Sequence, residues 1–266
     1  MERTLGHLTP ATRWVGSRVD YHPTLDSTNL RADALARAGA PEGTLVIADA
    51  QTAGRGRVGR SWFSPPGRNL YLSLILRPDL RPDQAHAYAF VGALAVADLA
   101  AARIGRAGAV EIKWPNDVLA SGRKLSGVNL PAWIEGDRIA ALVLGIGLNV
   151  NLAADELPAE LRSLATSLRI ETGQMQDRVA IAEELCVRLE AWCERLRRDG
   201  FPPILDAYSK WLRMRGSRVR IGGPGIAREV EGVALGLAED GALLLETPGG
   251  VERILAGDVQ LVSKET

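Results

Sequence analysis

The chain has 266 residues, 46% of them hydrophobic, and its 32 basic residues balance its 32 acidic ones. Because a typical domain has roughly 100 to 200 residues, we expect one large domain, residues 1–214, and a small one, residues 215–266. A net charge of zero gives no overall field that attracts nucleic acid or an anionic membrane, so any electrostatic recognition must be local and a DNA-binding protein is disfavoured.

Up to residue 214 the chain mixes strand and helix patterns after a loose N-terminal arm. Strands are predicted at 19–25, 44–49, 70–76, 110–113, 124–130 and 140–149, and helices at 27–38, 84–102 and 177–198, with a short helix to about 214. Ser27 or Asp26 is the expected N-cap of the first helix. Residues 115–117 are expected to form a turn within a mixed sheet, which makes the class α+β.

The last fifty residues have a different pattern, with short strand-like runs separated by glycine turns. The runs are 219–221, 230–235, 242–246, 251–255 and 259–262. Five short strands in so short a segment predict a small C-terminal barrel.

No segment predicts a membrane span or a secreted protein. The longest apolar stretch, 87–97, ends at Asp98 and is shorter than the ~18 residues that a span requires, so it predicts a buried helix. The N-terminus has no hydrophobic core of a signal peptide, and we therefore expect a cytoplasmic protein. Cys186 and Cys193 lie seven residues apart on one face of a predicted helix, which predicts core packing rather than a metal or redox site.

The segment 54–60, GRGRVGR, is the first candidate for function. Its glycines have the spacing of a dinucleotide-binding fingerprint, but the prolines at 65 and 66 exclude the helix that the fingerprint requires. A flexible phosphate-binding segment and a solvated surface turn remain open. Glycine lets a backbone approach a ligand closely, and arginine provides permanently charged donors for carboxylate and phosphate oxygens.

Lys113 and Lys124 are two of only four lysines in the chain and lie in the same predicted sheet region. A lysine is a compact point charge that can bridge an attacking carboxylate and an α-phosphate, two anions that must meet before a mixed anhydride forms. The alternative is a hairpin whose charges are merely solvated.

Five motifs, taken together and in order, resemble biotin protein ligases. They are DSTN at 26–29, QTAGRGRVGR at 51–60, KWPND at 113–117, RKLSG at 123–127 and GIGLNV at 145–150. The resemblance implies a class II synthetase-like catalytic domain with an SH3-like C-terminal barrel. It also implies that biotin and MgATP form biotinyl-5'-AMP, and that a lysine of a biotin carboxyl carrier domain then receives the biotin.

The resemblance assigns roles residue by residue. For biotin it implies Ser27, Thr28, Asn29, Gln51, Gly54, Arg55, Gly56, Arg57, Tyr71, Lys124 and Gly127; for ATP it implies Arg55, Arg57, Trp62, Asn116, Asp117, Lys124 and Asn149. Lys124 and Arg57 are the expected catalytic residues, with Lys124 between the biotin carboxylate and the α-phosphate and Arg57 retaining the adenylate. Asp117 is expected to approach Mg²⁺ through the phosphates, and Arg60 has no assigned role.

The chain departs from the family pattern at Asn129 and Pro131, where an apolar pocket wall is expected. Asn129 and Pro131 leave open a non-catalytic protein that binds biotinyl-AMP, and a lipoate or octanoyl ligase is a second alternative because those proteins resemble this fold. Roughly twenty residues precede the first strand, which leaves no room for the helix-turn-helix domain of bifunctional members, and we expect no DNA partner. A monomer and a homodimer are both compatible with the sequence.

Overall fold

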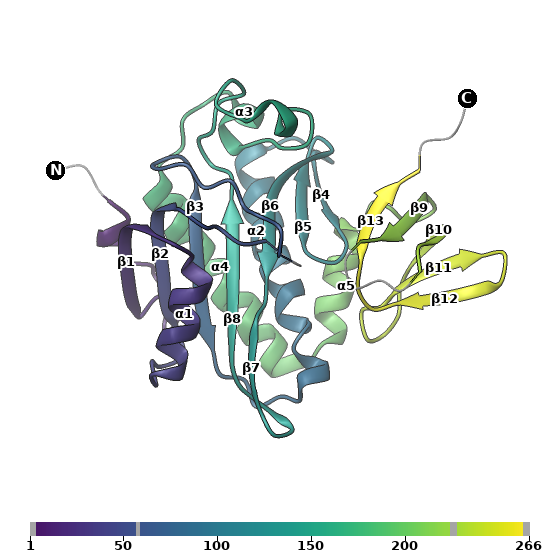
Figure 1. Ribbon diagram of the computed structural model, residues 1–266, viewed down its shortest axis with the longest axis horizontal. Helices are drawn as coiled ribbons and strands as arrows, with labels where there is room; N and C mark the ends of the chain where they lie inside the picture. Colours follow the sequence, from purple (N-terminus) through teal and green to yellow (C-terminus); the bar gives the residue numbers. More distant parts are fainter. Residues whose placement is uncertain (1–3, 57–58, 224–227, 263–266) are drawn as a thin grey trace.

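The computed structural model describes residues 4–56, 59–223 and 228–262 (Figure 1). The larger part consists of β1 (Arg18–Leu25), α1 (Thr28–Arg37), β2 (Thr44–Gln51), β3 (Leu70–Leu76), α2 (Ala87–Ile104), β4 (Val110–Lys113), β5 (Asp117–Ala120), β6 (Arg123–Asn129), β7 (Ala132–Glu135), β8 (Arg138–Leu148), α3 (Leu168–Thr172), α4 (Arg178–Asp199) and α5 (Pro202–Trp211). The smaller part consists of β9 (Arg218–Gly222), β10 (Val230–Leu237), β11 (Leu243–Thr247), β12 (Gly250–Ile254) and β13 (Asp258–Leu261). This arrangement confirms the α+β class and the five C-terminal strands.

One mixed sheet forms the centre of the larger part, in the order β1-β2-β3-β8-β6-β5-β4. β1 and β2 are parallel and the other neighbours are antiparallel. β8 is long enough to pair with β6 through residues 145–148 and with β7 nearer its start. Every residue of β3 is buried, as its unbroken apolar sequence predicts for a central strand.

Helices cover the two faces of this sheet unequally. In Figure 1, α1 lies in front of β2 and β3, whereas α2 and α4 lie behind the sheet. α2 is rich in alanine and its glycine, Gly92, allows close packing, because a Cβ there would lie 3.0 Å from both Leu144 and Val128. The helix ends at Gly105 in the left-handed conformation. The front face beyond α1 is therefore left open for a site.

The sequence argument that this apolar segment is too short for a membrane span was wrong, because the helical segment extends well beyond residues 87–97. The segment Pro82–Ile104 is long and apolar enough to cross a membrane, with a mean hydropathy of 1.6, yet 67% of its most apolar window is buried inside the protein. Burial between the sheet and α4, rather than shortness, identifies it as a core helix. Cys186 and Cys193 are free thiols in the same core, as predicted.

The N-terminal arm is not loose, contrary to the sequence prediction. Leu5, Leu8 and Val15 are buried. The carboxylate of Glu190, on α4, accepts hydrogen bonds from the backbone amides of residues 13–15 at 2.8–3.0 Å. Together with Glu183 and Glu194, which accept hydrogen bonds from Thr9 and Trp14, this buried acid holds the arm against the helix layer, and no local pattern could reveal these interactions.

Three elements were not predicted. β5 begins at Asp117, and the expected turn at 115–117 lies one residue earlier, at 114–116, where it connects β4 to β5 in a three-stranded β4-β5-β6 meander. β7 follows Pro131, whose carbonyl accepts a hydrogen bond from the Val143 amide at 2.9 Å. α3 has only five residues and is capped by the Ser167 hydroxyl. Segments this short give too little periodicity to be recognised.

The C-terminal strands form an antiparallel sheet in the order β12-β11-β10-β9-β13. The predicted boundary at 214/215 falls in the connection between α5 and β9. The two parts are in contact: the Trp114 indole N–H donates to the Gly241 carbonyl at 3.0 Å, and Arg60 pairs with Asp258 at 2.7 Å.

Candidate functional site

A strip of sheet without side chains forms the floor of a pocket on the front face. The strand register places Tyr71 (β3), Gly147 (β8), Gly127 (β6), Asp117 (β5) and Lys113 (β4) in one line across five strands. Directly paired antiparallel residues point to the same face of a sheet. The two central glycines leave room for the Trp62 indole, which lies 2.5 Å from where a Cβ on Gly147 would stand and 3.1 Å from where one on Gly127 would stand.

The neighbouring register row extends this floor. It contains Ser73 (β3), Gly145 (β8) and Asn129 (β6). A Cβ on Gly145 would lie 2.1 Å from Oδ1 of Asn29, so only glycine lets the α1 side chain reach down to the sheet. The floor and α1 are thus fitted to each other.

A polar cluster closes one end of the pocket. The Gln51 side-chain carbonyl accepts hydrogen bonds from the Thr28 amide at 2.9 Å and the Thr28 hydroxyl at 3.2 Å. The Ser73 hydroxyl lies 2.6 Å from Asn29 Oδ1 and 2.9 Å from Thr28 Oγ1. Thr28 and Ser73 are buried, so the amide and hydroxyl groups at this end are held in fixed orientations and largely shielded from solvent. Such a cluster suits a compact polar ligand group.

Tyr71 forms a wall beside this cluster. Its ring is buried and its hydroxyl donates to the Pro65 carbonyl at 3.0 Å. Burial raises the pKa of Tyr71 well above its ordinary value, so the phenol stays neutral. The residue contributes shape and an apolar face rather than charge.

The opposite end of the pocket is charged. Lys124 Nζ lies 2.8 Å from Asp117 Oδ1 and 5.3 Å from the centre of the Trp62 ring. Burial lowers the pKa of Lys113, while the nearby Asp117 carboxylate acts in the opposite direction. Arg55 and Arg60 also line the pocket. This end combines four cationic side chains with one carboxylate, which favours an anionic ligand.

A second, apolar pocket adjoins the charged end. Its lining is Ser61, Trp62, Phe63, Lys124, Asn149, Leu152, Leu157, Leu161 and Ala165. Leu152, Leu157 and Ala165 form a small hydrophobic cluster of their own. Ser61, Trp62 and Lys124 line both pockets, so Lys124 stands at the junction between a polar pocket and an apolar one.

The described parts of the glycine-arginine segment, residues 54–56 and 59–60, are held together where residues 55 and 56 meet residues 60 and 61. Arg55 and Ser61 make an isolated antiparallel bridge, and the Gly56 amide donates to the Arg60 carbonyl at 2.7 Å. Arg60 Nη2 then reaches Asp258 on β13 at 2.7 Å. Arg60, which had no role assigned from the sequence, thus connects this segment to the C-terminal sheet.

Comparison with known proteins identifies the fold and its motifs. The sequence model of the biotin/lipoate A/B protein ligase family matches residues 21–149, and that of the biotin protein ligase C terminal domain matches residues 216–262. A biotin--[acetyl-CoA-carboxylase] ligase of Paracoccus denitrificans is 37% identical over 88% of this chain and 96% of its own length. The chain belongs to the biotin protein ligase family.

Two further relatives support this membership. The bifunctional ligase/repressor BirA of Bacillus subtilis is 37% identical over 94% of this chain and 76% of its own length. The biotin protein ligase from Aquifex aeolicus, solved in complex with biotin and ATP, is 30% identical and superposes with a TM-score of 0.78, covering 92% of this chain and 99% of the other. The similarity therefore includes both parts of the fold.

Most of the residues that the family resemblance assigned come together. Thr28, Asn29, Gln51, Arg55, Gly56, Trp62, Tyr71, Asn116, Asp117, Lys124 and Gly127 all line the polar pocket. Ser27 and Gly54 are buried beside it instead of lining it, and Asn149 lines the apolar pocket. Arg57 lies outside the described residues.

Three of these residues have structural partners that sequence could not show. Asn116 donates its side-chain amide to the Val128 carbonyl and so holds β6. Asn149 uses its side chain for Asn69, at 3.2 Å, and for the Thr166 carbonyl, at 2.9 Å. A Cβ on Gly54 would lie 2.6 Å from Ser64 Oγ and from the Trp62 carbonyl, so this glycine permits the loop to fold back.

Sequence reasoning missed Ser73 and the four aliphatic residues of the apolar pocket. Ser73 was detectable in principle, because it is the one serine in the strand LYLSLIL, whose other members are aliphatic residues and Tyr71. The apolar residues Leu152, Leu157, Leu161 and Ala165 come from an irregular segment without periodicity. Only their three-dimensional clustering beside Lys124 reveals them.

Proposed function

We propose that the protein activates biotin with MgATP as biotinyl-5'-AMP and transfers the biotin to a lysine of a biotin carboxyl carrier domain. The observation that carries this proposal is the position of Lys124 at the junction of the polar and apolar pockets. Relatives named biotin--[acetyl-CoA-carboxylase] ligase, and the Aquifex aeolicus ligase solved with biotin and ATP, support it.

In this proposal the polar cluster receives the ureido ring of biotin. A urea has two N–H donors and a carbonyl acceptor, and leaving one of them buried and unpaired costs about 1–3 kcal/mol. Thr28, Asn29, Gln51 and Ser73 together provide hydroxyl and amide partners of both kinds. The valeryl chain then lies along the glycine floor toward Lys124.

The adenylation step takes place at the charged end. A biotin carboxylate oxygen forms a bond to the α-phosphorus of ATP, the bond from that phosphorus to the bridging oxygen breaks, and pyrophosphate leaves. Lys124 offsets the negative charge of both reacting anions, and the apolar pocket receives the adenine. When both anions are bound, Lys124 pairs with them instead of with Asp117. The Asp117 carboxylate would then be available to hold the metal.

Mg²⁺ enters this site with the nucleotide. No group of three or more His, Cys, Asp or Glu side chains occurs among the described residues, so the protein alone offers no cage for a metal. Mg²⁺ commonly binds through one or two carboxylates together with substrate phosphates and water. Asp117, at the charged end of the pocket, is the carboxylate that would bind Mg²⁺ in this way.

In the transfer step the amine of a carrier lysine attacks the acyl carbon, an amide forms, and AMP leaves with the bonding electrons while the amine gives up a proton. An anhydride is lost to hydrolysis if water reaches it, so a covering loop improves the yield. Arg55 and Gly56 line the pocket from above, in the loop that Arg60 connects to Asp258. Retention of the adenylate by Arg57 stays a prediction from the resemblance.

The proposal is tested with the purified full chain, biotin, MgATP and a carrier domain. We expect biotin-dependent pyrophosphate release and one biotin mass added at the carrier lysine. Lys124→Gln should slow pyrophosphate release by about 10²–10³-fold, the usual loss when one charge-stabilising donor is removed. Lys210→Gln is the matched control, because Lys210 is exposed on α5 and lines neither pocket. Absence of both products from the wild type would refute the proposal.

Parallel reactions with lipoate and octanoate separate the related activities. The match of residues 216–262 to the biotin protein ligase C terminal domain favours biotin. Asn129 lines the polar pocket, and its Oδ1 accepts the Leu130 amide at 3.1 Å, so the unusual amide is partly satisfied within the protein. Transfer of octanoate in preference to biotin would overturn the substrate assignment, and tight adenylate binding without transfer would reduce the protein to a binding role.

A further inference from the structure

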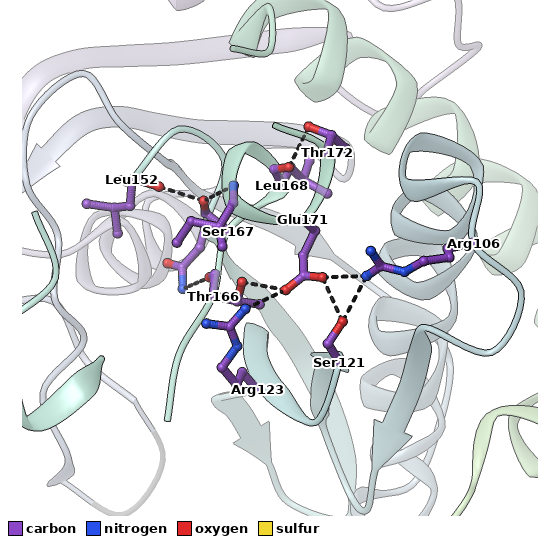
Figure 2. A network of polar contacts seen from close by, with 11 residues as sticks. Arg106, Ser121, Arg123, Leu152, Thr166, Ser167, Leu168, Glu171 and Thr172 are labelled. Carbon is purple, nitrogen blue, oxygen red and sulfur yellow. Dashed lines mark hydrogen bonds and ion pairs between the residues drawn. The ribbon is translucent and has the colours of Figure 1, made fainter. Parts of the chain in front are cut away.

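Glu171, on α3, is a buried carboxylate that four side chains hold in place (Figure 2). Its side chain is only 3% exposed. Oε1 accepts hydrogen bonds from Thr166 Oγ1 at 2.7 Å and Arg123 Nη2 at 3.0 Å. Oε2 accepts hydrogen bonds from Ser121 Oγ and Arg106 Nη2, both at 2.7 Å. Three separate segments of the chain therefore meet at one carboxylate.

This carboxylate is ionised at neutral pH. Burial alone raises the pKa of Glu171, but the hydrogen bonds from two hydroxyls and two guanidinium groups lower it overall below the ordinary value. Hydrogen bonds to a charged group are roughly twice as strong as neutral ones. Glu171 and its four hydrogen-bond partners, called the Glu171 node below, therefore hold the segments that carry those partners firmly in place.

Thr166 connects the Glu171 node to the backbone of Lys124. The Lys124 amide donates to the Leu164 carbonyl at 2.8 Å, and the Thr166 amide donates to the Lys124 carbonyl at 2.9 Å. Ala165 and Lys124 thus form an isolated parallel bridge. The segment 164–166 holds the Lys124 backbone on both its N–H and its C=O side.

The same segment forms one wall of the apolar pocket. Ala165 lines that pocket directly, and the Thr166 carbonyl accepts a hydrogen bond from the Asn149 side chain at 2.9 Å. Asn149 is itself part of the lining. A displacement of residues 164–166 would therefore move the pocket wall and Lys124 together.

We propose that Glu171 is a positioning residue for the adenylation step: through Thr166 it fixes the segment that sets both the reach of Lys124 and the shape of the apolar pocket. This inference rests on the proposed function only for its kinetic readout. Glu171 touches no substrate, since it lines neither pocket. Substitution of Glu171 is expected to change the KM for ATP. The binding of biotin should stay the same, because the polar cluster that receives biotin belongs to other elements.

Glu184, on α4, provides a matched control. It also accepts hydrogen bonds from two arginines, Arg103 at 2.9 Å and Arg188 at 2.7 Å, and its side chain is 25% exposed. Its pKa is lowered in the same way, because hydrogen bonds from both arginines outweigh burial. The difference is location, since α4 and α2 lie behind the sheet, and no residue of either helix lines either pocket.

The first experiment compares Glu171→Gln with Glu184→Gln in the full chain by biotin-dependent exchange of pyrophosphate into ATP. For Glu171→Gln we expect the KM for ATP to rise about tenfold or more, because a shift of about 1 Å in a positioned group can cost roughly 10²-fold. The dissociation constant for biotin should stay within about twofold of the wild type. Glu184→Gln should change neither value. Equal kinetics in the two variants would overturn the proposal.

A second pair of variants isolates the connection itself. Thr166→Val removes the hydroxyl that joins the segment to Glu171, whereas Ser121→Ala removes a hydroxyl on the β5–β6 turn and leaves the segment attached. We expect Thr166→Val to raise the KM for ATP and Ser121→Ala to leave it near the wild-type value. The reverse order would contradict positioning through Thr166. This pair also serves if Glu171→Gln does not fold.

Hydrogen exchange separates failure of this inference from failure of the proposed function. The amides of Lys124 and Thr166 make the two hydrogen bonds that attach the segment to β6. Glu171→Gln, or Thr166→Val in its place, should accelerate their exchange at least tenfold relative to Glu184→Gln. If the wild type shows no pyrophosphate exchange, the proposed function fails while this measurement still decides the inference. Unchanged protection at both amides would refute it.

Discussion

Gly147→Ala is the sharpest test of the glycine floor. An added Cβ would lie 2.5, 2.7 and 2.8 Å from three atoms of the Trp62 indole. Because carbon atoms in contact prefer separations of about 3.5–4.0 Å, the ring must retreat by about 1 Å. Overpacking of this kind costs about 1–3 kcal/mol. For a chain of this size each kcal/mol lowers the Tm by roughly 2–4 °C, so we expect a Tm loss of a few degrees to about ten.

The kinetic effect should exceed the effect on stability. Trp62 lines both pockets, and a displacement of about 1 Å at a reacting site can reduce the rate roughly 10²-fold. The assay is biotin-dependent pyrophosphate exchange, with Gly249→Ala as control because the nearest atom to its added Cβ is 3.7 Å away. A Gly147→Ala protein with wild-type Tm and wild-type KM values for biotin and ATP would show that the floor does not confine the indole.

Two further predictions concern the attachments of the N-terminal arm and the loop. Burial alone raises the pKa of Glu190, but hydrogen bonds from the amides of residues 13–15 lower that pKa overall, below the ordinary 4.5. The ionised carboxylate therefore stabilises the fold fully above pH 4.5, and this stabilisation is lost as the pH falls through the lower pKa of the folded state. Glu190→Gln should therefore lose about 2 kcal/mol or more at pH 7 by urea unfolding, and the gap to wild type should narrow toward pH 3; a constant gap would contradict this. Asp258→Asn breaks the ion pair with Arg60, whose side chain is 54% exposed while that of Asp258 is 29% exposed. We therefore expect the free energy of unfolding to fall by less than about 1 kcal/mol, and this difference to disappear at high salt. A larger or salt-independent loss would show that the pair is not a surface contact.

Local patterns predicted the elements whose own sequence dictates them. β3 was placed correctly at both ends because seven successive residues suit a buried strand. α4 was predicted one residue from its observed limits, since its apolar residues keep helical spacing and Asp177 caps its first turn. Motif resemblance gave the pocket, and eleven of its assigned residues line the polar pocket together.

What the sequence could not give are interactions between distant segments. The line from Tyr71 to Lys113 exists only because five strands adopt one register, and no local signal fixes that register. Glu190 lies in a predicted helix and Glu171 in a segment without a predicted element, yet the side chain of each is buried by contacts with a segment far away in the chain. Such roles depend on tertiary contacts that periodicity does not encode.

The C-terminal sheet is part of the scaffold of the site, because two of its residues hold opposite sides of the charged end. Asp258 holds Arg60 and hence the loop above the pocket, while the Gly241 carbonyl accepts the indole N–H of Trp114, three residues before Asp117. Gly241 has φ +81°, and a Cβ there would lie 2.9 Å from the Phe90 ring, so only glycine lets this carbonyl reach the buried indole. Removing the small sheet would therefore release both the loop and the turn that carries Asp117, even though the small sheet supplies no residue to the floor of the pocket.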